Sequence, residues 1–107
     1  MSDGTGQKDG RPEAFLQFIH RFPKLGKAWE IMREAEAEAG PLDEKTRRLV
    51  KLAIAAATAA EGATHSAARK ARRAGASLEE LEQVVALAAS TVGLPNAVKI
   101  HCWIREA

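Results

Sequence analysis

The sequence predicts an all-α fold, a single-domain bundle of about six helices. Apolar residues recur at helical spacing along most of the chain, and no segment shows the sustained apolar–polar alternation of a strand. Glycine and proline interrupt this pattern where helices are expected to end. We expect helices over residues 12–22, 24–39, 44–60, 63–74, 78–92 and 95–106.

Several of these helices have recognisable ends. Asp43 is a suitable N-cap for the third helix, and Gly40-Pro41 stops the one before it. Ser77 and Glu80 have the spacing of a capping box at the start of the fifth helix. The run AIAAATAA in the third helix is rich in small residues, which predicts close packing against neighbouring helices.

Composition sets limits on the class of protein. The 107 residues, 46% hydrophobic and 28% charged, indicate one globular domain, which we place at residues 11–107 after a disordered leader at 1–10. The net charge of +2 does not indicate a nucleic-acid partner, and no apolar run is long enough to span a membrane. Cys102 is the single cysteine, so no internal disulfide can form, and we expect a cytoplasmic protein.

Glu61 and His65 are the first candidates for chemistry. They lie four residues apart, which places both side chains on one helix face near the start of the fourth helix. The positive end of that helix favours an anionic ligand and a neutral imidazole that can accept a proton. A glutamate that orients such a histidine forms a general-base pair. The alternative is structural, with Glu61 capping the helix and His65 making a polar contact between helices.

The remaining polar residues have simpler interpretations. Ser66 and Arg69 are candidates to bind a small anionic substrate, although basic residues in the last turn of this helix also match its dipole. His20, His65, His101 and Cys102 form no HExxH or CxxC pattern, so we expect no metal site and no cofactor. We expect Cys102 to be a buried small hydrophobic residue, and Trp29 and Trp103 to be core or interface residues.

Three segments together resemble one family. PLDEKTRRLVKLAIAAA (41–57), EGATHSAARKARRAGAS (61–77) and LEELEQVVALAASTVGLPNAV (78–98) are similar to the carboxymuconolactone decarboxylase and alkylhydroperoxidase D-like family. The resemblance covers roughly residues 41–103 and implies an alkylhydroperoxidase D-like helical bundle. It also implies self-assembly into trimers or hexamers, with sites near subunit interfaces.

The resemblance argues against the thiol chemistry of the family's peroxidase branch. That branch uses a glutamate, a CxxC pair and a histidine, which the resemblance would place at residues 48, 60, 63 and 67. The chain has Arg48, Ala60, Ala63 and Ala67 there, and a thiol–disulfide cycle needs two thiols. A peroxidase would have to rely on Cys102 alone.

The chain is instead similar to a cysteine-free subgroup with an EGAxHS signature, formed here by residues 61–66. Because this signature occupies the turn at which the peroxidases keep their active site, the resemblance implies a functional site at Glu61 and His65. Two hypotheses follow. One is a cofactor-free acid–base enzyme acting on a small carboxylate or lactone, and the other is a non-catalytic, oligomeric binding or scaffold protein.

Overall fold

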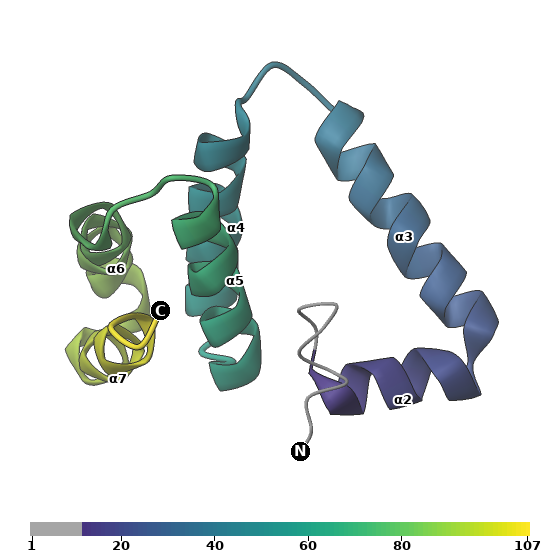
Figure 1. The fold of residues 1–107 in the computed structure, drawn as a ribbon. Helices are drawn as coiled ribbons and strands as arrows, with labels where there is room; N and C mark the ends of the chain where they lie inside the picture. Colours follow the sequence, from purple (N-terminus) through teal and green to yellow (C-terminus); the bar gives the residue numbers. More distant parts are fainter. Residues whose placement is uncertain (1–11) are drawn as a thin grey trace. The chain divides into compact units, whose positions relative to one another are not determined.

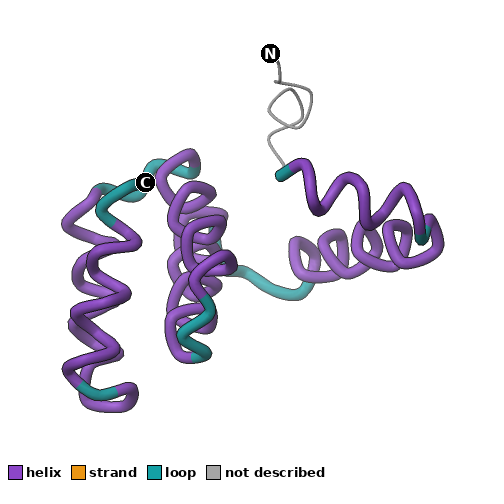
Figure 2. Tube along the Cα trace, turned by 90° about the horizontal axis from the view of Figure 1, so that it is seen from below, coloured by secondary structure: helices purple, strands orange, loops and turns teal. Residues whose placement is uncertain are grey.

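The computed structural model describes residues 12–107, which form six α-helices and no strand (Figures 1 and 2). The helices are α2 (Glu13–Arg21), α3 (Pro23–Glu38), α4 (Glu44–Ala57), α5 (Glu61–Arg73), α6 (Leu78–Val92) and α7 (Leu94–Ile104). The all-α class and the number of helices are therefore confirmed for this part of the chain. The leader predicted at residues 1–10 lies outside the described residues. No helix among those described is both long and apolar enough to cross a membrane.

The helices fall into two compact units, with α2 and α3 in the first and α4–α7 in the second, which begins at Pro41. In the first unit α2 and α3 form a hairpin. Its inner contacts include a T-shaped pair between Phe15 and Trp29, with ring centroids 5.7 Å apart. Gly26 permits close approach of the two helices, because a Cβ there would lie 3.0 Å from the Cβ of Ile19.

This hairpin has no buried residue of its own, in contrast to the second unit. Several of its large apolar side chains are strongly exposed, namely Phe18, Phe22, Leu25, Ile31 and Met32. Two helices offer too little apolar surface to form a separate core. The hairpin therefore has no hydrophobic core of its own.

The second unit contains a true hydrophobic core. Its fully buried residues come from all four helices: Leu52, Ala56, Ala68, Ala71, Leu81, Ile100 and Ile104. The pairs α4–α5 and α6–α7 lie side by side (Figure 1), and α4 also packs against α6. The small-residue run of α4 supplies two of its buried residues, Ala55 and Ala56.

The ends of α4 and α6 are fixed by side chains. The Asp43 carboxylate accepts a hydrogen bond from the Thr46 N–H at 2.8 Å, and Ser77 and Glu80 form the predicted capping box. Lys45 Nζ lies 2.9 Å from Glu80 Oε2, so this ion pair joins the start of α4 to the start of α6. The predicted N-cap and capping box are both confirmed.

The connection between α4 and α5 differs from the sequence prediction. The third predicted helix ends at Ala57 rather than Ala60, and the next begins at Glu61 rather than Ala63. The reason is Ala59, which adopts a left-handed backbone with φ 54° and reverses the chain. Glycine is the usual residue in that conformation, so an alanine there gave no stop signal. The last helix ends at Ile104 rather than Glu106.

The buried leucines should dominate the stability of the second unit. Leu81 is fully buried, whereas Leu94 is 71% exposed. We expect Leu81→Ala to lower the free energy of unfolding by roughly 2–5 kcal/mol, because it removes buried methyl groups and leaves a cavity. The matched Leu94→Ala should change it by less than about 0.5 kcal/mol. Chemical denaturation of both variants measures this, and equal losses would contradict the core described above.

The link between α4 and α6 should depend on pH. The Ser77 N–H and the Lys45 ammonium hold the pKa of Glu80 below its ordinary value of 4.5. A depressed folded-state pKa adds stability above the ordinary value, and this contribution is lost as the pH falls through the folded-state pKa. We therefore expect Glu80→Gln to have a lower Tm than wild type near about pH 7, and the gap to close in acid.

The control for this experiment is Glu79→Gln, which removes a charge from the same helical turn outside the capping box. It should lower the Tm less than Glu80→Gln does. A Tm gap for Glu80→Gln that stays constant into the acid range would show that the carboxylate charge has no part in this link.

Candidate functional site

The candidate site lies at the start of α5. In an α-helix the first N–H groups have no carbonyl partner within the helix, and here the first intrahelical bond runs from the Thr64 N–H to the Ala60 carbonyl. Asp43 and Ser77 supply a side-chain acceptor at the starts of α4 and α6. Ala60 is the N-cap of α5 and has no such side chain. This helix start therefore presents N–H donors and a positive dipole end that no N-cap side chain satisfies.

Glu61 and His65 lie together on this helix, one turn apart. Glu61 Oε2 is 3.3 Å from His65 Nε2, so the two side chains share a face as their spacing predicted. The histidine is the more enclosed partner, with 21% of its side chain exposed against 63% for the glutamate. The imidazole is thus held in place and still partly open to solvent.

Glu106 and Trp103, at the end of the neighbouring α7 and just beyond it, complete this cluster, and the sequence predicted neither of them as a site residue. Glu106 Oε1 lies 3.8 Å from His65 Nδ1, and the Trp103 ring centroid lies 6.2 Å from that of the imidazole. Lys99 Nζ in turn lies 5.8 Å from the centroid of the Trp103 ring. No local pattern links residues 65 and 106, because only the packing of α5 on α7 brings them together.

The two carboxylates decide what the imidazole can do. A neutral imidazole carries one N–H donor, whereas carboxylates only accept hydrogen bonds. If His65 donates to Glu61 through Nε2, its Nδ1 becomes an acceptor, and this nitrogen faces the Glu106 carboxylate. In a protonated imidazole both ring nitrogens carry an N–H donor, so each of the two carboxylates would have a donor to accept from. The arrangement thus places a carboxylate beside each ring nitrogen of His65.

The structure separates the two predicted substrate-binding residues. Arg69 follows His65 by four residues on α5, so it shares the face of Glu61 and His65, and it is exposed. Ser66 is half-buried and points about 100° away from His65 around the helix axis, because each residue advances an α-helix by that angle. The hydroxyl of buried Thr64 donates to the Ala60 carbonyl at 2.7 Å and is therefore satisfied.

The other candidate residues lie elsewhere. His101 Nε2 is 2.7 Å from Glu82 Oε2, so this histidine joins α7 to α6. Cys102 is exposed, and the prediction that it is a buried hydrophobic residue was wrong, because α7 turns this position away from the core. Within residues 12–107 no three His, Cys, Asp or Glu side chains are grouped to hold a metal ion.

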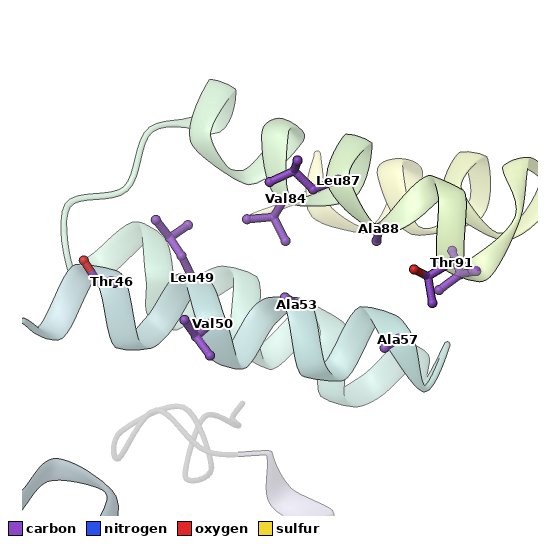
Figure 3. Close-up of a pocket in the computed structure, with 10 residues that line it drawn as sticks. Thr46, Leu49, Val50, Ala53, Ala57, Val84, Leu87, Ala88 and Thr91 are labelled. Atoms are coloured by element: carbon purple, nitrogen blue, oxygen red, sulfur yellow. The ribbon is translucent and has the colours of Figure 1, made fainter. Parts of the chain in front are cut away.

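A separate apolar cavity of about 380 Å³ lies between α4 and α6 (Figure 3). Its lining is almost entirely aliphatic: Thr46, Leu49, Val50, Ala53, Ala57, Val84, Leu87, Ala88, Thr91 and Val92. Neither Glu61 nor His65 lines it. The acid–base cluster and this cavity are therefore different features of the second unit.

The six helices of residues 12–107 place the described part of the protein in the all-α class. The sequence model of the "Carboxymuconolactone decarboxylase family" matches residues 23–105, and the chain belongs to this family. The match includes α3 as well as the whole of α4–α7, so it reaches further toward the N-terminus than the resemblance quoted from the sequence. No curated protein and no solved structure matches the chain significantly.

The electrostatic character of the α5 start can be tested with a thiol. In Ala60→Cys combined with Cys102→Ser, the new thiol lies at a helix N-terminus, where a thiolate is stabilised. We expect the new thiol to react with iodoacetamide about tenfold faster than native Cys102 does, because Cys102 lies in the last turn of α7, at the negative end of that helix. Ala86→Cys, at an exposed position within α6, provides a reference. Equal rates at residues 60 and 86 would show that the start of α5 does not favour an anion.

Proposed function

We propose that the protein is a cofactor-free acid–base enzyme that acts on a small carboxylate or lactone at Glu61 and His65. The observation that carries this proposal is the pairing of an oriented, half-buried imidazole with a helix start that has no capping side chain. Membership in the carboxymuconolactone decarboxylase family supports it at the level of the family. Proton transfer on such substrates requires no redox partner, which agrees with the absence of a cysteine pair.

The proposed chemistry begins with an anionic group at the α5 start. Backbone N–H groups of Gly62 and Ala63 donate to the substrate carboxylate, and Arg69 adds positive charge one turn beyond His65. Gly62 suits this role, because a Cβ there would meet no atom within 4 Å and its absence leaves the backbone open. The substrate is thereby held beside the imidazole.

His65 then takes a proton from the carbon next to the substrate carbonyl. The C–H bond breaks, an N–H bond forms on the imidazole, and the electron pair moves to the carbonyl oxygen as an enolate. The Glu61 carboxylate orients the ring and stabilises its protonated form. In a substrate with a carbon–carbon double bond next to the deprotonated carbon, the electron pair spreads over that bond, and return of the proton to its far carbon shifts the double bond and completes an isomerisation. We assign Glu61 the part of a positioning residue. In this scheme Glu106 moves away from Nδ1 when substrate binds.

An alternative is a non-catalytic, oligomeric binding or scaffold protein. The position of the cavity favours it, because the cavity lies between α4 and α6 and not at His65. In this alternative the Glu61–His65–Glu106 cluster stabilises the contact between α5 and α7. A homo-oligomer, a trimer or hexamer, agrees with both functions, and only the enzyme requires a small anionic substrate. The peroxidase alternative would depend on Cys102, and peroxide reduction unchanged in Cys102→Ala would eliminate it.

Proton abstraction can be measured without knowing the product. A panel of small carboxylates and lactones is incubated with the protein in D₂O, and deuterium exchange at the carbon next to the carbonyl is followed by NMR. We expect exchange with at least one substrate, and a rate roughly 10²–10⁴-fold lower in His65→Gln because the general base is lost. Glu61→Gln should show a smaller loss.

The matched control is His101→Gln, because His101 also pairs with a glutamate, Glu82, within the same unit. It should exchange at the wild-type rate. If His65→Gln and His101→Gln exchange equally fast, or if no substrate exchanges above the buffer rate, the acid–base function is wrong and the binding alternative gains support.

A further inference from the structure

Charge is distributed unevenly in the second unit. Helices α4 and α5 lie side by side (Figure 1) and together carry eight basic residues but only two acidic ones, Glu44 and Glu61. The whole chain has 16 basic and 14 acidic residues, so the remainder of the sequence is acidic. The small net charge of +2 is therefore the balance between a strongly basic helix pair and an acidic remainder.

The last turns of α5 concentrate this positive charge. Four of the last five residues of the helix are basic, namely Arg69, Lys70, Arg72 and Arg73. Arg69, Arg72 and Arg73 are exposed, and within residues 12–107 none of these three forms a salt bridge. Positions three and four residues apart are neighbours on a helix surface, with Cβ atoms roughly 5–6 Å apart. The three residues therefore form one group, which we call the arginine cluster.

The helix dipole accounts for only part of this charge. The C-terminal end of a helix carries about half an elementary negative charge, which favours one nearby cation, whereas α5 has four. Arg69 and Arg73 lie four residues apart, and like charges at that spacing destabilise a helix. A local arrangement that lowers helix stability is expected at functional sites, where a bound anion offsets the repulsion.

We propose that the arginine cluster binds the phosphate backbone of a double-stranded nucleic acid. The guanidinium group of arginine can donate two parallel hydrogen bonds to one phosphate. A duplex carries one negative charge per about 1.7 Å of its axis, so each member of the cluster can meet a phosphate. The basic residues of α4 add to the attraction at longer range. Such contacts do not read the base sequence, and the proposal is independent of the chemistry at His65.

The composition of α5 favours a duplex over other anionic partners. No apolar side chain in α5 is larger than alanine, and residues 66–73 contain no aromatic ring. Protein partners are bound mainly through aromatic or aliphatic anchors, and helices that lie on a lipid surface insert similar side chains. Proteins that bind single-stranded nucleic acids stack the bases on aromatic rings. The phosphates of a duplex require only cations, so they are the partner that this face fits.

The test measures binding of the full-length protein to a fluorescein-labelled DNA duplex of mixed sequence, and to an RNA duplex, by fluorescence anisotropy. In Arg72→Gln combined with Arg73→Gln, we expect the dissociation constant to rise at least about tenfold at low salt, because two phosphate contacts are lost. The slope of log K against log salt concentration should become shallower by about 2. Arg69 is left unchanged, because the proposed function assigns it to the substrate.

The matched control is Lys24→Gln combined with Lys27→Gln, which removes the same charge from two exposed positions of α3. It should bind both duplexes as tightly as wild type does. A second variant, Arg72→Lys combined with Arg73→Lys, keeps the charge but loses the two-pronged geometry of arginine. It should keep the wild-type salt slope and bind about two- to fivefold more weakly.

Each possible outcome decides the proposal. Binding to either duplex with the expected loss in the glutamine variant supports it, and a preference for one duplex identifies the source of the phosphates. Absence of duplex binding at low salt overturns it, as does an equal loss in the α3 control. A glutamine variant with a lower Tm and unchanged duplex binding would show that the cluster serves only the helix dipole. Tighter binding to polyglutamate than to either duplex would identify an acidic protein as the partner and also overturn the proposal.

Discussion

The rest of the second unit depends on the close contact between α4 and α5. Three alanines of these helices, Ala56, Ala68 and Ala71, are fully buried in the core. Because these side chains are small, the two backbones approach closely, and the larger Leu52 can reach the residues of α6 and α7 in a common core. The alanine-rich run therefore determines the spacing of the bundle, and larger side chains there would force the helices apart.

The same contact determines the position of the candidate site. Two closely packed antiparallel helices need a tight connection, and the chain makes it with Ala59 in a left-handed conformation at φ 54°. Such a conformation costs an alanine on the order of 1 kcal/mol, so the packing of the flanking helices maintains it. The turn ends at Ala60, which makes Glu61 the first residue of α5 and brings His65 beside α7.

The sequence predicted the features that depend on local chemistry. Periodicity gave six helices and the all-α class, and Asp43 and Ser77 gave two helix starts, because a capping side chain acts on its own backbone neighbours. The spacing of Glu61 and His65 gave their contact for the same reason. The turn at Ala59 was not predicted, because alanine rarely adopts the left-handed conformation that this turn requires. Glu106 was not predicted either, because its contact with His65 depends on tertiary packing, and the exposure of Cys102 depends on the rotation of α7.

Residues 60 and 63, at the start of α5, are alanines, and the field of a helix start acts on a thiolate and on a bound carboxylate alike. A helix N-terminus stabilises a thiolate through its N–H groups and dipole, and it stabilises a bound carboxylate through the same groups. Replacing a cysteine at such a position by alanine removes the thiol and leaves the field and the donors in place. At residue 60 alanine also supplies no capping oxygen, so the donors at Gly62 and Ala63 stay available for an external anion. The N–H donors and the dipole of this helix start are thus a property of the fold, and they are present whether or not a thiol stands there.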